Sequence, residues 1–85
     1  MTRDEIRSAV LDVLGGVAPE GDYARLKSDR PLRDQLDLDS YDFLNVMIQL
    51  SDRLGIDIPE ADYPRLVTLE ATVDYLIARV AARGT

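Results

Sequence analysis

The sequence predicts an all-α fold, a four-helix bundle of three main helices plus one short third helix. Apolar residues recur at the three- and four-residue spacing of amphipathic helices in three segments, and no segment carries a strand signal. A long connection separates the first two helices. With 85 residues the chain is long enough for one domain and too short for two. We therefore expect a single domain over residues 1–85.

The first helix is predicted to begin after Thr2. Thr2 and Glu5 have the spacing of a capping box, in which each side chain accepts a hydrogen bond from the other residue's backbone N–H. Apolar residues then recur on one face: Ile6, Val10, Val13, Leu14 and Val17. The Gly15-Gly16 pair is expected to end or fray this helix.

The connection over residues 16–39 has no sustained periodicity and contains Pro19, Gly21 and Pro31. So long a connection is uncommon in a compact domain, and it is usually either functional or disordered. Its leucines indicate that it is held against the bundle rather than free: Leu26, Leu32, Leu36 and Leu38.

The second helix is predicted to begin at Asp39 or Ser40 and to end at Gly55. Asp39 is a good N-cap, and Asp42 in the first turn suits the positive end of the helix dipole. Two apolar stripes follow. The first is a complete core stripe: Phe43, Val46, Met47, Leu50 and Leu54. The second lies beside Ser40: Tyr41, Leu44 and Ile48.

After an extended link over residues 56–58, Pro59 suits the first position of the short third helix. Pro64 limits that helix to a turn or two near Glu60–Leu66. The last helix is capped by Thr68, and its apolar face holds Leu69, Val73, Leu76, Ile77 and Val80.

The composition excludes several classes of site. The chain has no His, Cys or Trp, which removes Cys/His zinc sites, thiolate nucleophiles and imidazole-dependent triads. No apolar run approaches the roughly 20 residues of a membrane span, and the polar N-terminus is not a signal peptide. We expect a cytoplasmic protein, with no membrane span and no metal site of its own.

The net charge of −6 is concentrated in the middle third of the chain. Residues 34–62 carry eight acids against Arg53 alone. This field disfavours nucleic acid and suits a basic protein surface. The simpler interpretation is a solvated acidic face that keeps the domain soluble.

Ser40 lies where the long connection meets the second helix. Its hydroxyl is expected to be exposed beside free backbone N–H groups at a positive helix end, which suits a phosphate-type anion. The alternative is that serine and aspartate here only cap the helix, and the local pattern alone favours capping.

The wider sequence resembles the acyl carrier protein family. These are four-helix domains whose serine, in an Asp-Ser-Leu motif, carries a 4′-phosphopantetheine arm. The matching segments are Asp39-Ser40-Tyr41-Asp42, then Leu54-Gly55-Ile56-Asp57-Ile58-Pro59, then Leu69 to Leu76 at the start of the last helix. The resemblance implies an acyl-carrier-protein-like bundle and no enzyme activity.

By this resemblance, a separate phosphopantetheinyl transferase attaches the arm from coenzyme A to Ser40, and Asp39 helps that transferase recognise the serine. Acyl-loading and acyl-processing enzymes would dock on the second helix, at Tyr41, Asp42, Leu44 and Ile48. Pattern alone favours core packing for Leu44. We expect a monomer.

The sequence departs from the family at several positions. Leu38 stands where glycine is usual, and Tyr41 where leucine is usual. The second helix is also less acidic than in many fatty-acid carriers, because Asn45, Ser51 and Arg53 dilute it. Our hypothesis is a specialised discrete carrier for a secondary or dedicated pathway. The cargo stays open among fatty acyl, polyketide and, alternatively, aminoacyl or peptidyl groups.

Three other interpretations compete with the carrier. A calcium-binding EF-hand counted from Asp37 fails, because its fifth, sixth and twelfth positions are Tyr41, Asp42 and Ile48. A Ser40–Lys27 catalytic dyad would place its lysine in the irregular connection, with no oxyanion motif. The main rival is an unmodified acidic helical adaptor, in which Ser40 is merely a cap.

Overall fold

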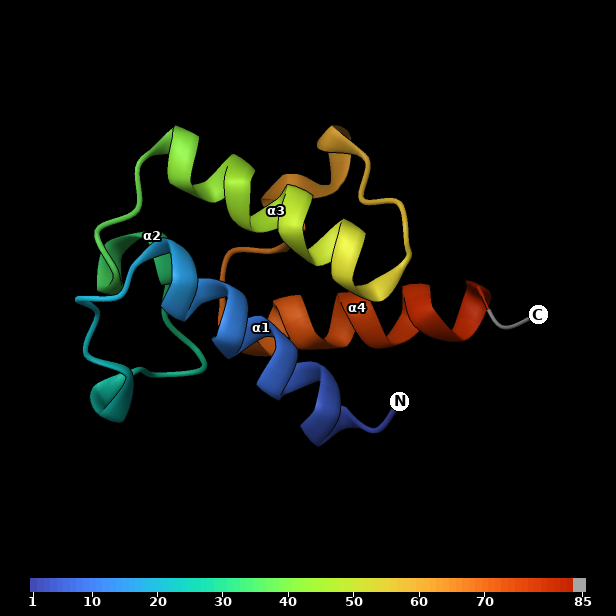
Figure 1. Cartoon of the computed structure of the whole chain (residues 1–85), viewed down its shortest axis with the longest axis horizontal. Coiled ribbons are helices and arrows are strands. Elements are labelled where there is room, and N and C mark those ends of the chain that lie inside the picture. The colour runs from blue at the N-terminus through green and yellow to red at the C-terminus, as the bar shows by residue number, and fades with distance from the viewer. Residues whose placement is uncertain (84–85) are drawn as a thin grey trace.

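Three helices of 15 residues form the body of the computed structural model, which describes residues 1–83 (Figure 1). They are α1 (Arg3–Val17), α3 (Ser40–Leu54) and α4 (Leu69–Arg83). Helix α1 packs against both α3 and α4. The short elements are η1 (Tyr23–Arg25), α2 (Leu32–Gln35) and η2 (Glu60–Arg65). The predicted all-α bundle with a short third helix is therefore confirmed, and that third helix, η2, is a 3₁₀-helix.

The core forms where the apolar faces of the three long helices meet. The complete core stripe predicted for α3 is buried along its whole length, and Leu14, Leu66 and Leu76 are fully buried beside it. Val17 and Ile77 are only partly buried at the edge of this core. An apolar cluster this continuous is the main source of stability in so small a domain.

Capping residues mark several helix ends at the predicted positions. Thr2 and Glu5 form the expected capping box, with N···O distances of 3.2 and 3.0 Å. Thr68 Oγ1 accepts a hydrogen bond from Ala71 N–H at 3.0 Å at the start of α4. Gly55 ends α3 in the left-handed conformation, with φ at 64°.

The expected end of the first helix at Gly15-Gly16 is wrong, because α1 continues through both glycines to Val17. Neither glycine has a positive φ. The helix is held in this region by the burial of Val13 and Leu14. That burial outweighs the roughly 1 kcal/mol by which each glycine disfavours a helix relative to alanine.

The connection between α1 and α3 is held against the bundle, as its leucines predicted. Leu32, Leu36 and Leu38 are buried, and Leu26 is partly buried. Two backbone hydrogen bonds join the connection to the start of α4: Leu32 N–H to Val67 O at 2.8 Å, and Glu70 N–H to Ser28 O at 3.0 Å. The single turns η1 and α2 were not predicted. In Figure 1, α2 lies below the beginning of α3.

A buried tyrosine ties η2 to α4. The Tyr75 hydroxyl donates to Asp62 Oδ2 at 2.6 Å and accepts from Arg79 Nε at 3.0 Å. Arg79 also forms an ion pair with Asp62 at 3.3 Å. Burial, and then the bond to Asp62, raise the pKa of Tyr75. The stabilisation from the neutral hydroxyl is therefore complete below the ordinary tyrosine pKa of about 10 and is lost as pH rises through the higher folded-state value.

Replacing Tyr75 with phenylalanine is expected to loosen η2, because the aromatic packing stays while the hydroxyl bridge is lost. We expect a loss of about 1 kcal/mol, which lowers the melting temperature of a domain this size by about 4–8 °C. Thermal unfolding followed by circular dichroism measures the loss, and amide exchange over residues 60–66 locates it. Tyr41→Phe is the control, since that side chain is 84% exposed. Equal melting temperatures for Y75F and wild type would contradict the expectation.

Candidate functional site

Ser40 is exposed and is the first residue of α3. The capping role belongs to its neighbour: Asp39 Oδ1 accepts from Asp42 N–H at 2.8 Å, and Asp42 Oδ2 accepts from Asp39 N–H at 3.3 Å. This reciprocal capping box fixes the start of the helix without using the serine. The Ser40 hydroxyl is therefore not the N-cap.

The Ser40 hydroxyl has an arginine beside it. Arg33, in α2, donates from Nη2 to Ser40 Oγ at 3.2 Å. Its guanidinium also lies over the Phe43 ring, 5.6 Å from the centroid. Nothing in the periodicity of the connection singled out Arg33, because its approach to Ser40 depends on the turn that α2 makes.

A groove of about 930 Å³ opens beside Ser40, between the start of α3 and the η2 segment. Phe43 and Tyr63 meet edge to face in its wall, with ring centroids 5.9 Å apart. Charged side chains also line it: Arg33, Asp34, Asp37 and Glu60. No local pattern in the sequence predicts this groove. It forms where two segments that are distant in sequence meet.

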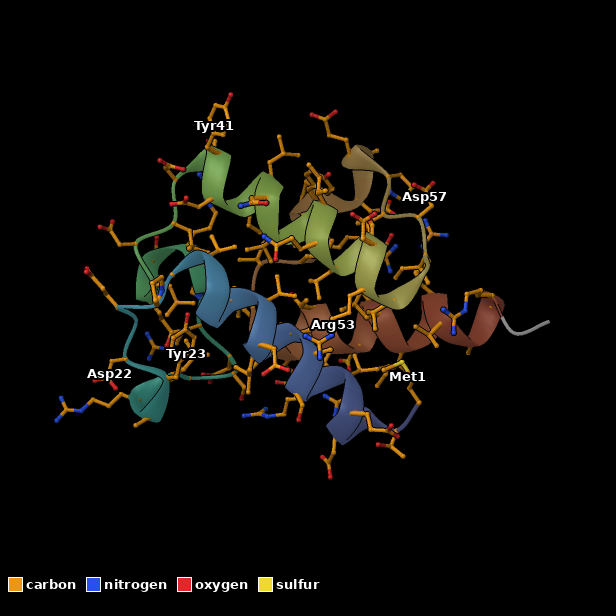
Figure 2. All side chains as sticks on the ribbon, viewed as in Figure 1. Met1, Asp22, Tyr23, Tyr41, Arg53 and Asp57 are labelled. Carbon is orange, nitrogen blue, oxygen red and sulfur yellow. The ribbon has the colours of Figure 1, made fainter. Side chains whose placement is uncertain are left out.

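The predicted docking residues lie on an outer stripe of α3. Tyr41, Leu44 and Ile48 are 84, 41 and 50% exposed, and Figure 2 shows Tyr41 pointing outward from the first turn. The expectation of core packing for Leu44 is wrong, because the core stripe already fills the inner face. Leu44 lines the groove instead, as does Val67, an exposed residue that the sequence did not single out.

The loop before Ser40 has one residue in the left-handed region, Asp37, with φ at 53°. Aspartate tolerates this conformation better than most residues other than glycine. Leu38, at the position where the resemblance led us to expect glycine, does not have a positive φ and is buried. The backbone position that favours glycine is therefore 37, while Leu38 contributes to the core.

Over residues 1–83 the side chain hydrogen-bonded to Ser40 Oγ is that of Arg33, not that of Lys27. The backbone of Lys27 is bonded to the Gln35 side chain: Lys27 N–H donates to Gln35 Oε1 at 2.7 Å, and Lys27 C=O accepts from Gln35 Nε2 at 2.9 Å. Over residues 1–83 no His/Cys/Asp/Glu group of three or more is placed to hold a metal ion. Within the same residues, no helix is long and apolar enough to cross a membrane.

The residues around Ser40 fit a covalently attached phosphate ester. The hydroxyl is exposed, it is free of the capping role, a cation lies within hydrogen-bond distance, and a groove begins at the same point. The fold and site thus define a small helical domain that presents a single serine at the head of a central helix, as carrier domains do.

Comparison with known proteins gives the family. A family model described as "phosphopantetheine attachment site" matches residues 4–76. The chain is 30% identical to the acyl carrier protein of Lactobacillus johnsonii, over 89% of this chain and 94% of that protein. It is 27% identical to the acyl carrier protein of Chloroherpeton thalassium, over 93% of this chain and 98% of the relative.

The fold agrees with a solved structure of the acyl carrier protein from Enterococcus faecalis. The TM-score is 0.72 at 23% identity, covering 93% of this chain and 99% of the other. The protein belongs to the acyl carrier protein family, whose members are carriers rather than catalysts. Its cofactor is covalently attached 4′-phosphopantetheine.

Proposed function

We propose that this domain carries acyl intermediates as thioesters on a 4′-phosphopantetheine arm attached to Ser40. The observation that carries the proposal is the placement of Ser40. Its hydroxyl is exposed at the head of α3, and the reciprocal bonds between Asp39 and Asp42 already cap the helix. A side chain that the fold does not need in this role is available for modification.

Attachment requires an enzyme from outside this chain. Ser40 Oγ gains a bond to phosphorus and loses its proton, and the nucleotide part of coenzyme A leaves, so that a phosphodiester remains. The chain has no histidine, and Lys27 is its only lysine. A phosphopantetheinyl transferase would supply the active site for this step, with Asp39 as part of what it recognises.

The arm supplies the chemistry of a terminal thiol, which bears the cargo as a thioester. Because the chain contains no cysteine, that thiol has no competitor on the protein. The cargo is an acyl group of fatty-acid, polyketide or related biosynthesis, with aminoacyl or peptidyl cargo as the alternative. Enzymes that load and process it would dock on the outer stripe of α3.

The exposed aromatic residue on this stripe supports a dedicated set of partners. Tyr41 presents a large, amphipathic side chain of the type that dominates binding energy at protein interfaces. Arg53, near the other end of α3, pairs with Asp12 at 3.0 Å and lowers the negative charge of that helix. Rapid, complete loading by a housekeeping malonyl transferase would argue against a specialised pathway.

The proposal is tested by incubating the purified apo protein with coenzyme A, Mg²⁺ and a broad-specificity phosphopantetheinyl transferase, followed by intact mass measurement. We expect the mass to rise by one phosphopantetheine. An unchanged mass, with an active transferase and demonstrably apo protein, would make the unmodified adaptor the leading alternative once a dedicated transferase had also failed.

Truncating Tyr41 to alanine is expected to weaken docking of partner enzymes. An aromatic residue at the centre of a contact costs more than about 1 kcal/mol when removed, so the transferase KM should rise by about fivefold or more. Gln49→Ala is the matched control, because Gln49 is exposed on the same helix two turns from Tyr41 and its side chain donates to Asn45 Oδ1 at 3.1 Å. The docking assignment would be contradicted if both variants kept the wild-type KM.

A further inference from the structure

Arg33 combines three features that the proposed function does not use. Its guanidinium donates to Ser40 Oγ at 3.2 Å and lies over the Phe43 ring. Its backbone carbonyl accepts from Leu38 N–H at 2.9 Å, which fastens α2 to the segment leading into Ser40. Its side chain forms no ion pair within residues 1–83. Arg33 is thus a positioned cation whose one charge is not neutralised by a direct partner.

Negative charge also gathers at the helix start that holds Ser40. The carboxylates of Asp39 and Asp42 both lie at the head of α3, and Asp39 already occupies the Asp42 N–H. A phosphodiester on Ser40 adds another negative charge beside them. Like charges at such separations repel, and the two carboxylates also offset the positive end of the helix dipole. The helix start alone is therefore a poor partner for this phosphate.

We infer that Arg33 binds the phosphodiester of the arm and is a positioning residue for it. The inference rests on the proposed attachment at Ser40. The non-bridging phosphate oxygens are two bonds from Ser40 Oγ, the atom that Arg33 already contacts. A guanidinium can donate two parallel hydrogen bonds to such a group, and these are among the stronger hydrogen bonds in proteins.

The consequence is a direction for the arm. Arg33 and Phe43 both line the groove that opens beside Ser40. A phosphate held by Arg33 therefore starts the arm on the groove side of α3, between that helix and the η2 segment. Within residues 1–83, Arg33 is the one cationic side chain within hydrogen-bond distance of Ser40 Oγ, so its removal leaves no substitute.

The test is ³¹P NMR of the phosphopantetheinylated protein, with intact mass confirming modification in each sample. The samples are wild type, Arg33→Ala, Arg33→Lys and Arg30→Ala. Arg30 is the matched control, an exposed arginine three residues away that contributes its backbone carbonyl to Gln35. Spectra are compared between about 10 mM and about 1 M NaCl, over which the Debye length falls from about 30 to about 3 Å.

We expect the ³¹P resonance of wild type and R30A to move with added salt toward the position of R33A, which itself barely moves. R33K keeps the charge but loses the two parallel donors of the guanidinium, so its ³¹P resonance should lie between those of wild type and R33A. The urea midpoint of R33A should stay close to that of wild type, which separates positioning from a structural role.

A modified R33A with the wild-type chemical shift and salt dependence would overturn the assignment of Arg33. So would a shift change that R30A reproduces. A wild-type protein that gains no mass with either a broad-specificity or a dedicated transferase would instead overturn attachment itself, and the inference with it.

Discussion

Ser40→Ala is expected to abolish attachment of the arm completely while leaving the fold intact. The free energy of unfolding should stay within about 0.5 kcal/mol of wild type, because an exposed side chain that does not cap its helix contributes little. Intact mass after incubation with coenzyme A and transferase measures loading, and urea unfolding measures stability. The two readouts together distinguish loss of the attachment atom from loss of the structure.

Ser51→Ala provides the control for this experiment. Ser51 is on the same helix, 11 residues further along, and is half-buried rather than at the helix start. S51A should load like wild type. Loading of S40A to the wild-type level would exclude Ser40 as the attachment site and turn attention to the other serines: Ser8, Ser28 and Ser51.

The second large effect is on stability. Leu50→Ala removes a fully buried side chain from the centre of the core stripe of α3. Truncating a buried leucine to alanine costs about 2–5 kcal/mol, whereas the whole free energy of unfolding of an ordinary domain is about 5–15 kcal/mol. We expect L50A to lose a large share of its stability, measured by urea unfolding with circular dichroism.

Leu44→Ala is the matched control, since it makes the same chemical change on the same helix at a residue that is 41% exposed. Its expected cost is below about 1 kcal/mol, because truncating Leu44 removes less buried apolar surface than truncating Leu50 and leaves no closed cavity. If the two variants were equally stable, the assignment of the inner and outer faces of α3 would be wrong.

The elements set by local chemistry could be predicted from the sequence. Thr2 with Glu5, Asp39 with its neighbour Asp42, and Gly55 mark helix ends through contacts between residues close in the chain. Such contacts form wherever the helix forms, so their sequence spacing is sufficient to find them. The position of Ser40 at the head of α3 followed from the same signals.

The features that the sequence did not predict depend on contacts with the rest of the fold. Gly15 and Gly16 stay helical because the adjoining residues are buried against other helices. Leu44 is exposed because the inner face of α3 is already full. The contact of Arg33 with Ser40 needs the turn at α2, and the groove needs Tyr63 brought against Phe43. No local sequence pattern predicts these contacts between distant segments.

The central claim is that one particular oxygen, Ser40 Oγ, carries the arm. The most direct measurement is fragmentation mass spectrometry of the tryptic peptide spanning residues 34–53, taken from transferase-treated protein. This peptide contains both Ser40 and Ser51, so one spectrum compares the two candidates. We predict that fragments containing Ser40 carry the added phosphopantetheine and that fragments with Ser51 but not Ser40 do not. The added mass on Ser51, or on a peptide with neither serine, would contradict the claim.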